Sequence, residues 1–454
     1  MKNIEIVFWG ALVLLAVLWL LAEQPDSEMT ANILALRGSM IQFSGVLAMG
    51  CMSLAMVLAT RPRWPERWLG GLDKTYRLHK WLGIGGLVLA VAHWLWAQGF
   101  KWAIGFGWIA MPERRPPPTM EGAAEQTLEQ TLLSLRGPAE GLGEWAFYIA
   151  VLLIVVALIQ FIPYRIFYKT HRLIAVVYLV LVFHAAVLTT FSYWTTPLGV
   201  VMAVLMAYGT VAAAIVLLRR VGAGRKVDGT ISRLHYYPEL SVLEGDIDVP
   251  EGWPGHKPGQ FAFVTSDSTE GAHPYTIASR WNPSNHRLTF IVKGLGDHTS
   301  RLRETLRVGQ PVKVEGPYGS FTFDDGCSRQ IWVGGGIGIT PFIARMKELA
   351  QEPGHAAGTL RRIDLFHSTR DYSEEAIAKL KADAAAANIR LHVLHDARDG
   401  LLDGDRIRAA VPDWLDGSVW FCGPVGFGRA LRRDLAAHGL PVTRRFHQEL
   451  FAMR

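Results

Sequence analysis

The chain has 454 residues, half of them hydrophobic, and a formal net charge of +6 at pH 7. The length allows two or three domains, and the hydrophobic share points toward a membrane protein. The surplus of 46 Lys and Arg over 40 Asp and Glu lies at the ends of apolar segments, which excludes a separate basic surface for nucleic acid. Three scattered cysteines, Cys51, Cys327 and Cys422, exclude a disulfide framework and a zinc site, and they fit a cytoplasmic catalytic half.

Six apolar segments approach the length of a membrane-spanning helix. They cover residues 4–22, 39–60, 77–97, 144–162, 172–191 and 197–218, and nothing after Arg219 qualifies. The first segment runs into Glu23 and Gln24 without a cleavage pattern of small residues, so we interpret it as an anchor and not as a signal peptide.

Basic residues gather in the loops after the second, fourth and sixth segments. They are Arg61, Arg63, Arg67, Lys74, Arg77, Arg165, Lys169, Arg172, Arg219, Arg220, Arg225 and Lys226. The positive-inside rule therefore predicts a multi-pass protein of the cell inner membrane, with its N-terminus and its C-terminal half in the cytoplasm.

Two of the predicted spans each carry a pair of histidines. His79 and His93 are 14 residues apart on the third span, and His171 and His184 are 13 residues apart on the fifth. At about 1.5 Å per residue, the members of each pair lie roughly 20 Å apart along the helix. A single buried histidine is usually just hydrogen-bonded, but matched spacing on two spans favours ligation of haem iron. We expect His79 with His171 to hold one b-type haem and His93 with His184 a second, outer one.

The spacing of the second histidine pair does not fit this arrangement on an ideal helix. An offset of 13 residues leaves His171 and His184 on different faces of an ideal helix, so a frayed helix start, a bend or a tilted haem must absorb the difference. Arg37, the cation of the loop from Glu23 to Ser39, is expected near the outer haem. It is either an interfacial arginine or a charge that attracts an anion there. We assign no catalytic or binding residues to the long outer stretch from Gln98 to Gly143.

The pattern changes after the sixth span. Short alternating runs separated by turn residues predict an antiparallel β-barrel over residues 223–326. Strands alternating with helical stretches predict an α/β parallel-sheet, nucleotide-binding domain over residues 327–454. The expected fold is therefore a six-helix transmembrane haem bundle over residues 1–222, followed by these two domains.

Three short motifs in the second half suit nucleotide phosphates and rings. Residues 333–342 read VGGGIGITPF, a strand that runs through Gly334, Gly335, Gly336 and Gly338 into a helix beginning near Thr340 and Pro341. Missing side chains let a pyrophosphate approach the amide groups at the positive end of the helix. Residues 273–279 read HPYTIAS, in which Tyr275 can hold a flat ring and the hydroxyl groups of Thr276 and Ser279 can reach its edge. Lys293 with the segment from Gly296 to Thr299 is a second phosphate-binding candidate.

Taken in order with Gly316-Pro317-Tyr318-Gly319 and Cys422-Gly423-Pro424, these motifs resemble the ferredoxin-reductase family. The resemblance implies FAD on the barrel, NAD(P)H on the parallel sheet and Cys422 close to the nicotinamide. The flavin would be held by His273, Pro274, Tyr275, Thr276, Ser279, Lys293, Gly296 and Thr299.

Together with the histidine-bearing spans, the chain resembles the NADPH oxidase and ferric reductase superfamily over nearly its whole length. In that superfamily the flavin motif typically begins with histidine, as His273 does here. The ending FHQELF is similar to the family's terminal motif, whose aromatic ring stacks on the flavin, and Phe451 is its match, although three residues follow it. The family usually contacts the 2′-phosphate where Ser368 and Arg370 lie, which favours NADPH, with NADH possible because Asp371 follows.

The resemblance implies electron transfer from cytoplasmic NADPH through FAD and two haems to an outer acceptor. O2 giving superoxide is the first expectation, with Arg37 attracting the anion. Oxygen-reducing members also tend to carry a second histidine one turn after the outer ligand, where Ala97 stands here. The alternatives are reduction of a ferric or cupric chelate, or electron donation to a periplasmic partner protein that docks on the stretch from Gln98 to Gly143.

Overall fold

The computed structural model describes residues 2–23, 33–109, 128–159, 161–352 and 361–449. They form two compact units, and each is described by itself. The first holds the residues up to Leu69 together with Lys74–Val221, and the second holds Gly70–Asp73 and the chain from Gly222 onward.

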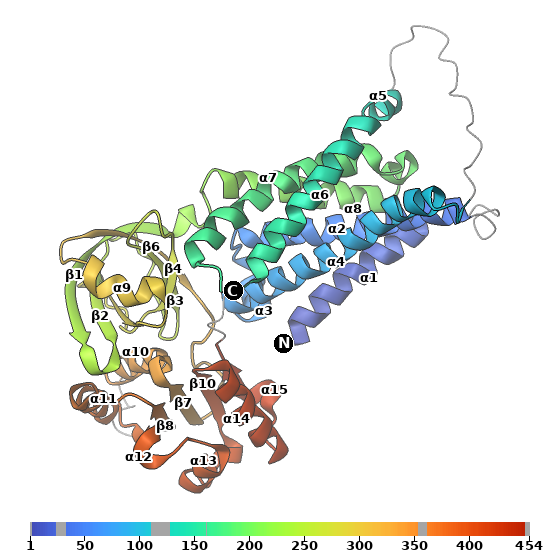
Figure 1. The fold of residues 1–454 in the computed structure, drawn as a ribbon. Helices are drawn as coiled ribbons and strands as arrows, with labels where there is room; N and C mark the ends of the chain where they lie inside the picture. Colours follow the sequence, from blue (N-terminus) through green and yellow to red (C-terminus); the bar gives the residue numbers. More distant parts are fainter. Residues whose placement is uncertain (1, 24–32, 110–127, 160, 353–360, 450–454) are drawn as a thin grey trace, which may run out of the picture. The chain divides into compact units, whose positions relative to one another are not determined.

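The first unit is a bundle of helices (Figure 1). Its helices are α1 (Lys2–Ala22), α2 (Ile33–Ala59), α3 (Trp64–Leu69), α4 (Leu72–Gly105), α5 (Leu128–Ser134), α6 (Arg136–Leu158), α7 (Tyr164–Leu188) and α8 (Pro197–Leu217). Among the described residues, six of these are long and apolar enough to cross a membrane, namely α1, α2, α4, α6, α7 and α8. The structure therefore has a long apolar helix at each of the six predicted segments.

Several helices extend beyond their predicted apolar segments, and α6 and α7 begin well before theirs, at Arg136 and Tyr164. Helix α2 begins at Ile33 and α4 continues to Gly105, beyond the predicted starts and ends. Hydropathy marks only the part of a helix that suits lipid, whereas the hydrogen-bonded backbone continues wherever no proline or cap stops it. By contrast, Pro163 precedes α7 and Pro197 opens α8, where a proline is tolerated because the first helical amides lack partners.

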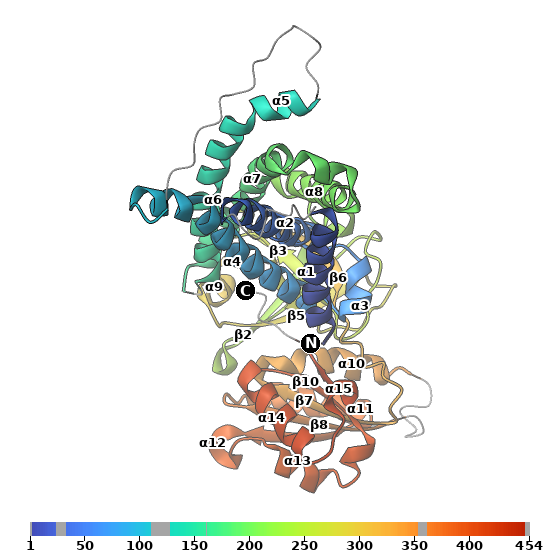
Figure 2. The same ribbon diagram turned by 90° about the vertical axis from the view of Figure 1, so that its right-hand side faces the viewer.

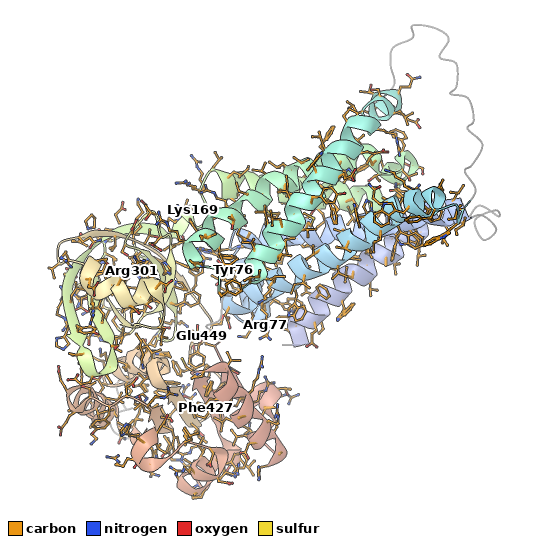
Figure 3. All side chains as sticks on the ribbon, in the orientation of Figure 1. Tyr76, Arg77, Lys169, Arg301, Phe427 and Glu449 are labelled. Atoms are coloured by element: carbon orange, nitrogen blue, oxygen red, sulfur yellow. The ribbon has the colours of Figure 1, made fainter. Side chains whose placement is uncertain are left out.

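Close helix packing holds the middle of the bundle. Helix α6 runs along α7, and α2 runs along α8. Tyr178 of α7 is fully buried, and its hydroxyl lies 2.9 Å from the hydroxyl of Ser53. A Cβ on Gly209 of α8 would come within 1.9 Å of the Tyr178 hydroxyl, so only glycine allows this approach. Figure 3 shows Arg77 of α4 and Lys169 of α7 at the same end of the bundle, as the charge pattern requires.

The second unit begins with a six-stranded antiparallel sheet. Its elements are β1 (Lys226–Tyr237), β2 (Val242–Asp248), β3 (Phe261–Thr265), β4 (His273–Thr276), β5 (Arg287–Lys293), α9 (Asp297–Thr305) and β6 (Pro311–Tyr318). The strand order is β4-β3-β6-β1-β2-β5. The two edge strands meet only through one isolated bridge, from Ile277 just after β4 to Phe290 of β5. The expected barrel is therefore not closed, because the short β4 ends before a ladder with β5 can form.

A parallel sheet follows in the same unit. Its elements are β7 (Arg329–Gly335), α10 (Thr340–Leu349), β8 (Arg362–Thr369), α11 (Glu374–Ala386), β9 (Arg390–His395), α12 (Asp396–Asp399), α13 (Gly404–Ala410), β10 (Ser418–Cys422), α14 (Val425–Ala437), α15 (Val442–Arg445) and β11 (Phe446–Gln448). The strand order is β11-β10-β7-β8-β9, all parallel. Helices α10 and α11 cover one face and α13 and α14 the other (Figure 2). The predicted doubly wound sheet is confirmed.

Candidate functional site

The four membrane histidines form two facing pairs. The ring centroids of His79 and His171 are 5.9 Å apart, and those of His93 and His184 are 6.2 Å apart. A histidine nitrogen binds a transition metal at about 2 Å, so two rings on opposite sides of one metal have centroids roughly 6 Å apart. The structure thus brings together the same pairs that the spacing indicated, at a separation that fits one metal between the two rings.

Backbone carbonyl groups orient three of these rings. The Nδ1 atoms of His79, His93 and His184 lie 2.8, 2.9 and 2.8 Å from the carbonyl oxygens of Ala55, Ile41 and Ala139. An Nδ1–H that donates to a carbonyl leaves the Nε2 lone pair available, which is the usual state of a metal-binding imidazole. The tautomer of these rings therefore fits ligation through Nε2.

Two glycines allow the rings to pack against neighbouring helices. A Cβ on Gly143 of α6 would lie 2.0 Å from Nδ1 of His184, and one on Gly45 of α2 would lie 3.2 Å from Nδ1 of His93. Sequence reasoning missed both residues: Gly143 was expected to end the outer stretch but lies inside α6, and a glycine inside an apolar helix, such as Gly45, has many uses. No local sequence signal marks either contact, because packing decides which glycine faces a histidine ring; Gly143 lies one turn after Ala139, whose carbonyl accepts from His184.

Helix α7 resolves part of the difficulty with the 13-residue offset. It is continuous from Tyr164 to Leu188, so His171 lies well inside the helix and a frayed start does not explain the offset. The ring of His171 also stacks on Phe167, with centroids 5.0 Å apart. A bend or a tilt of the bound group remains as the explanation.

A cavity of about 330 Å³ opens beside the outer pair, His93 and His184. Its volume lies within the range of small-molecule and cofactor sites. Arg37 lines it and donates hydrogen bonds to the carbonyl oxygens of Trp96 and Ala97, at 3.2 and 3.0 Å. The other charged or amide-bearing side chains of the lining are Gln42, Gln98, Lys101, Arg136, Glu140 and Glu144. The facing rings, their tautomer and this cavity fit a haem group held by the outer pair.

In the second unit, the expected flavin motif lies on an edge strand of the antiparallel sheet. Strand β4 carries His273, Pro274, Tyr275 and Thr276. The ring of His273 stacks on that of His298, which lies in the first turn of α9, with centroids 3.8 Å apart. Burial, and secondly the nearby His298, lowers the pKa of His273 to about 4, so His273 is neutral at pH 7. Burial lowers the pKa of His298 as well.

The hydroxyl groups expected to contact flavin also serve the local fold. Oγ1 of Thr299 accepts the N–H groups of Leu295 and Gly296, at 3.0 and 3.1 Å, and so caps the start of α9. Oγ of Ser279 accepts the N–H of Thr289, at 3.1 Å. These contacts shape the loops in which a phosphate or a ring would lie.

The turn that follows β7 packs closely against the carboxyl end of the neighbouring parallel strand β10. A Cβ on Gly338 would lie 2.2 Å from the carbonyl oxygen of Cys422, and one on Gly335 would lie 2.9 Å from Cδ of Pro424. Gly336 has φ +55°, and a Cβ there would meet nothing within 4 Å. These glycines therefore serve different purposes: Gly335 and Gly338 allow the close packing against residues 422–424, while Gly336 faces open space just before α10.

Two further members of this motif region are buried. Oγ1 of Thr340 donates to the carbonyl oxygen of Ile337, at 2.8 Å. The side chain of Cys422 is fully buried in the core that includes Trp332, and burial raises the pKa of its thiol well above the usual range, with Glu449 as the second cause. The Cys422 thiol is therefore neutral. Phe451, the expected flavin-stacking residue, lies outside the described residues.

A cleft runs between the antiparallel sheet and the carboxyl ends of β7 and β8. Gly336, His367, Thr369, Lys293 and Asp371 are among its lining residues. Nδ1 of His367 lies 3.2 Å from the carbonyl oxygen of Gly334, and burial lowers the pKa of His367 to about 4. Lys293 forms an ion pair with Asp371, so a nucleotide phosphate that binds Lys293 must replace this carboxylate.

Ser368 and Arg370 lie next to this cleft but do not line it, because successive strand residues point to opposite faces. Ser368 is nearly buried, and its hydroxyl lies 3.0 Å from the carboxylate of Asp396. Arg370 is exposed, as a contact to a bound nucleotide requires. Sequence reasoning missed Asp396, because only the pairing of β8 with β9 brings it beside Ser368.

Each half of the chain matches a known protein family. Residues 44–182 match the family described as the ferric reductase like transmembrane component, and residues 230–322 match a FAD-binding domain family. A flavohemoprotein of Deinococcus radiodurans is 26% identical over 212 residues, which cover 42% of this chain and 51% of that protein. A glycine betaine monooxygenase reductase subunit of Chromohalobacter salexigens is 27% identical over 218 residues, which cover 43% and 56%. The chain thus spans about half the length of these curated relatives.

Among solved structures, an Amycolatopsis cytochrome P450 reductase is similar at 21% identity with a TM-score of 0.43, covering 50% of this chain and 70% of that one.

The protein is therefore a membrane protein that joins a ferric-reductase-like transmembrane half to a FAD-binding half. These two matches confirm the predicted resemblance to the ferric reductase and NADPH oxidase superfamily.

Proposed function

We propose that the chain moves electrons from cytoplasmic NAD(P)H through FAD and two b-type haems to O2 on the outer side, giving superoxide. The observation that carries this proposal is the pair of facing histidine sets, 5.9 and 6.2 Å between ring centroids, within the half that matches a ferric reductase. The FAD-binding match in the second half supplies the link to a nicotinamide nucleotide.

The cofactors carry the redox chemistry: bound FAD takes a hydride and passes on single electrons, and haem iron takes one electron at a time. The side chains and backbone of the protein position these cofactors. His79 and His171 hold the inner haem, and His93 and His184 hold the outer one. Strand β4 and the start of α9 hold the flavin, and the open space at Gly336 admits the nucleotide pyrophosphate to the amide groups there.

The proposed arrangement has domain limits and an orientation. Residues 1–222 form the haem domain in the inner membrane, residues 223–326 the flavin domain and residues 327–454 the nucleotide domain. The basic loops after the second, fourth and sixth spans, with Arg77 and Lys169 at one end of the bundle, support a cytoplasmic location for the N-terminus and for the last two domains.

The position of Arg37 supports O2 as the acceptor. Its guanidinium group lies in the lining of the cavity beside the outer histidines, where a positive charge stabilises an anionic product such as superoxide. The same cavity supports a second candidate, reduction of an anionic ferric or cupric chelate, because Lys101 and Arg136 also line it. A periplasmic partner protein would instead make turnover depend on an added component.

A direct test supplies purified protein with NADPH and no partner, and compares superoxide release with reduction of a ferric chelate. We expect a low-spin bis-imidazole spectrum with about two haems per chain, and O2 consumption faster than chelate reduction. Chelate reduction that exceeds O2 consumption would favour the second candidate. Flavin reduction without turnover of either acceptor would favour the partner protein.

Arg370 provides a test of nucleotide choice. A charge-assisted contact to a 2′-phosphate contributes about 1.5 to 3 kcal/mol, so Arg370→Ala should lower kcat/KM for NADPH by roughly 10- to 150-fold. NADH has no group at this position to lose and should be nearly unaffected. The measurement is steady-state oxidation of both nucleotides with ferricyanide as acceptor. Equal small changes for both would mean that Arg370 does not contact the 2′-phosphate.

A further inference from the structure

The carboxyl ends of β8 and β9 lie side by side at the edge where the nucleotide is proposed to bind. The two strands are parallel, with Ser368 opposite Leu394 and Thr369 opposite His395. The residues that follow, Arg370 after β8 and Asp396 after β9, therefore lie at the same level. Nε2 of His395 also lies 3.0 Å from the carbonyl oxygen of Arg370, which ties the two strand ends together.

The carboxylate of Asp396 has a different kind of partner from the other acid at this edge. Its partner is neutral, since the hydroxyl of Ser368 donates to Oδ1 of Asp396 at 3.0 Å. The next cation along the chain, Arg398, pairs with Asp399 at 2.9 Å. The other nearby acid differs, because Asp371 pairs with Lys293 and is thereby neutralised. Of these two carboxylates, only that of Asp396 has no cation as its partner within the described part of the chain.

A carboxylate and a guanidinium have opposite effects on the two nucleotides. A carboxylate accepts a hydrogen bond from the ribose 2′-hydroxyl of NADH and repels the 2′-phosphate of NADPH, whereas an arginine favours the phosphate. We infer that Asp396 is a specificity-determining residue that faces the 2′ position of the adenosine ribose. Its charge favours NADH there, whereas Arg370 favours NADPH. Ser368 is then a positioning residue that holds the Asp396 carboxylate, and not itself a ligand of the 2′-phosphate. This inference rests on the proposed use of NAD(P)H.

The test uses the full-length purified protein with ferricyanide as electron acceptor. Asp396→Asn keeps the size of the side chain and an oxygen that can accept from Ser368, but it removes the charge. It should raise kcat/KM for NADPH by about tenfold while kcat/KM for NADH stays level or falls. A matched control is Asp405→Asn, which removes one charge from an exposed carboxylate on α13 and should change neither value.

A binding measurement gives a second readout that needs no turnover. Titration calorimetry compares adenosine 2′,5′-bisphosphate with AMP, which lacks the 2′-phosphate. In the wild type we expect the two dissociation constants to lie within about tenfold of each other, since Arg370 and Asp396 oppose each other. In Asp396→Asn the bisphosphate should bind about tenfold tighter and AMP should be unchanged.

The possible outcomes separate this inference from the proposed function. If the wild type oxidises neither nucleotide, both fail. If it oxidises them but Asp396→Asn leaves the NADPH to NADH ratio unchanged, the inference is overturned and the proposed function stands. Should the variant not fold, a wild type that binds the bisphosphate more than about a hundredfold tighter than AMP overturns the inference by itself.

Discussion

Gly143→Ala should remove the outer haem and leave the inner one in place. The added Cβ would lie 2.0 Å from Nδ1 of His184, so the ring must leave its hydrogen bond to the Ala139 carbonyl or α6 must move away from α7. Loss of such an orienting contact typically lowers metal affinity by about 10- to 100-fold, and displacement of the ring itself should cost more. The haem content should fall from about two to about one per chain.

The same helix offers a matched control. A Cβ on Gly141 would meet nothing within 4 Å, so Gly141→Ala should retain both haems. Haem content by pyridine haemochrome, with the reduced difference spectrum, measures each variant, and His184→Leu provides the reference for loss of the outer haem. A Gly143→Ala protein with full haem content and an unchanged spectrum would falsify the role assigned to His184.

Gly338→Ala should disable the nucleotide-binding half. Its Cβ would come within 2.2 Å of the Cys422 carbonyl oxygen and 2.6 Å of the carbonyl carbon, which are backbone atoms and cannot rotate away. Forcing the turn after β7 away from the end of β10 is an overpacking change in a buried site, with a cost of about 1 to 3 kcal/mol or more. We expect a lower melting temperature of the flavin-containing protein and a fall in kcat/KM for NADPH of at least about tenfold.

Substitutions at two other glycines distinguish a loss of stability from a loss of nucleotide binding. Gly426→Ala, on α14 with nothing within 4 Å, should behave like the wild type. Gly336→Val should mainly raise KM for the nucleotide, because the side chain would enter the open space proposed for the pyrophosphate, with added strain from its φ of +55°. Melting curves and steady-state kinetics distinguish these cases. Wild-type stability and kinetics in Gly338→Ala would show that the contact between this turn and the end of β10 tolerates a side chain.

Features that depend on local composition or spacing could be predicted from the sequence. The six spans follow from runs of apolar residues, and the alternation of strands and helices in the last third follows from short-range patterning. The pairing of His79 with His171 and of His93 with His184 followed from matched offsets, because helical rise converts a residue count into a depth. The glycine motif was also visible, since it occupies consecutive positions.

Features that depend on contacts between distant segments were decided only by the tertiary structure. A short β4 left the predicted barrel open, and β11 joined the sheet through pairing with β10. The close approach of Gly143 to His184 and the contact of Ser368 with Asp396 join residues 41 and 28 positions apart in sequence. No local pattern encodes such contacts, because they depend on which helix faces or strand ends become neighbours when the chain packs. The sequence by itself thus determined the membrane spans, the histidine pairs and the glycine loop, whereas packing decided which glycines and carboxylates meet them.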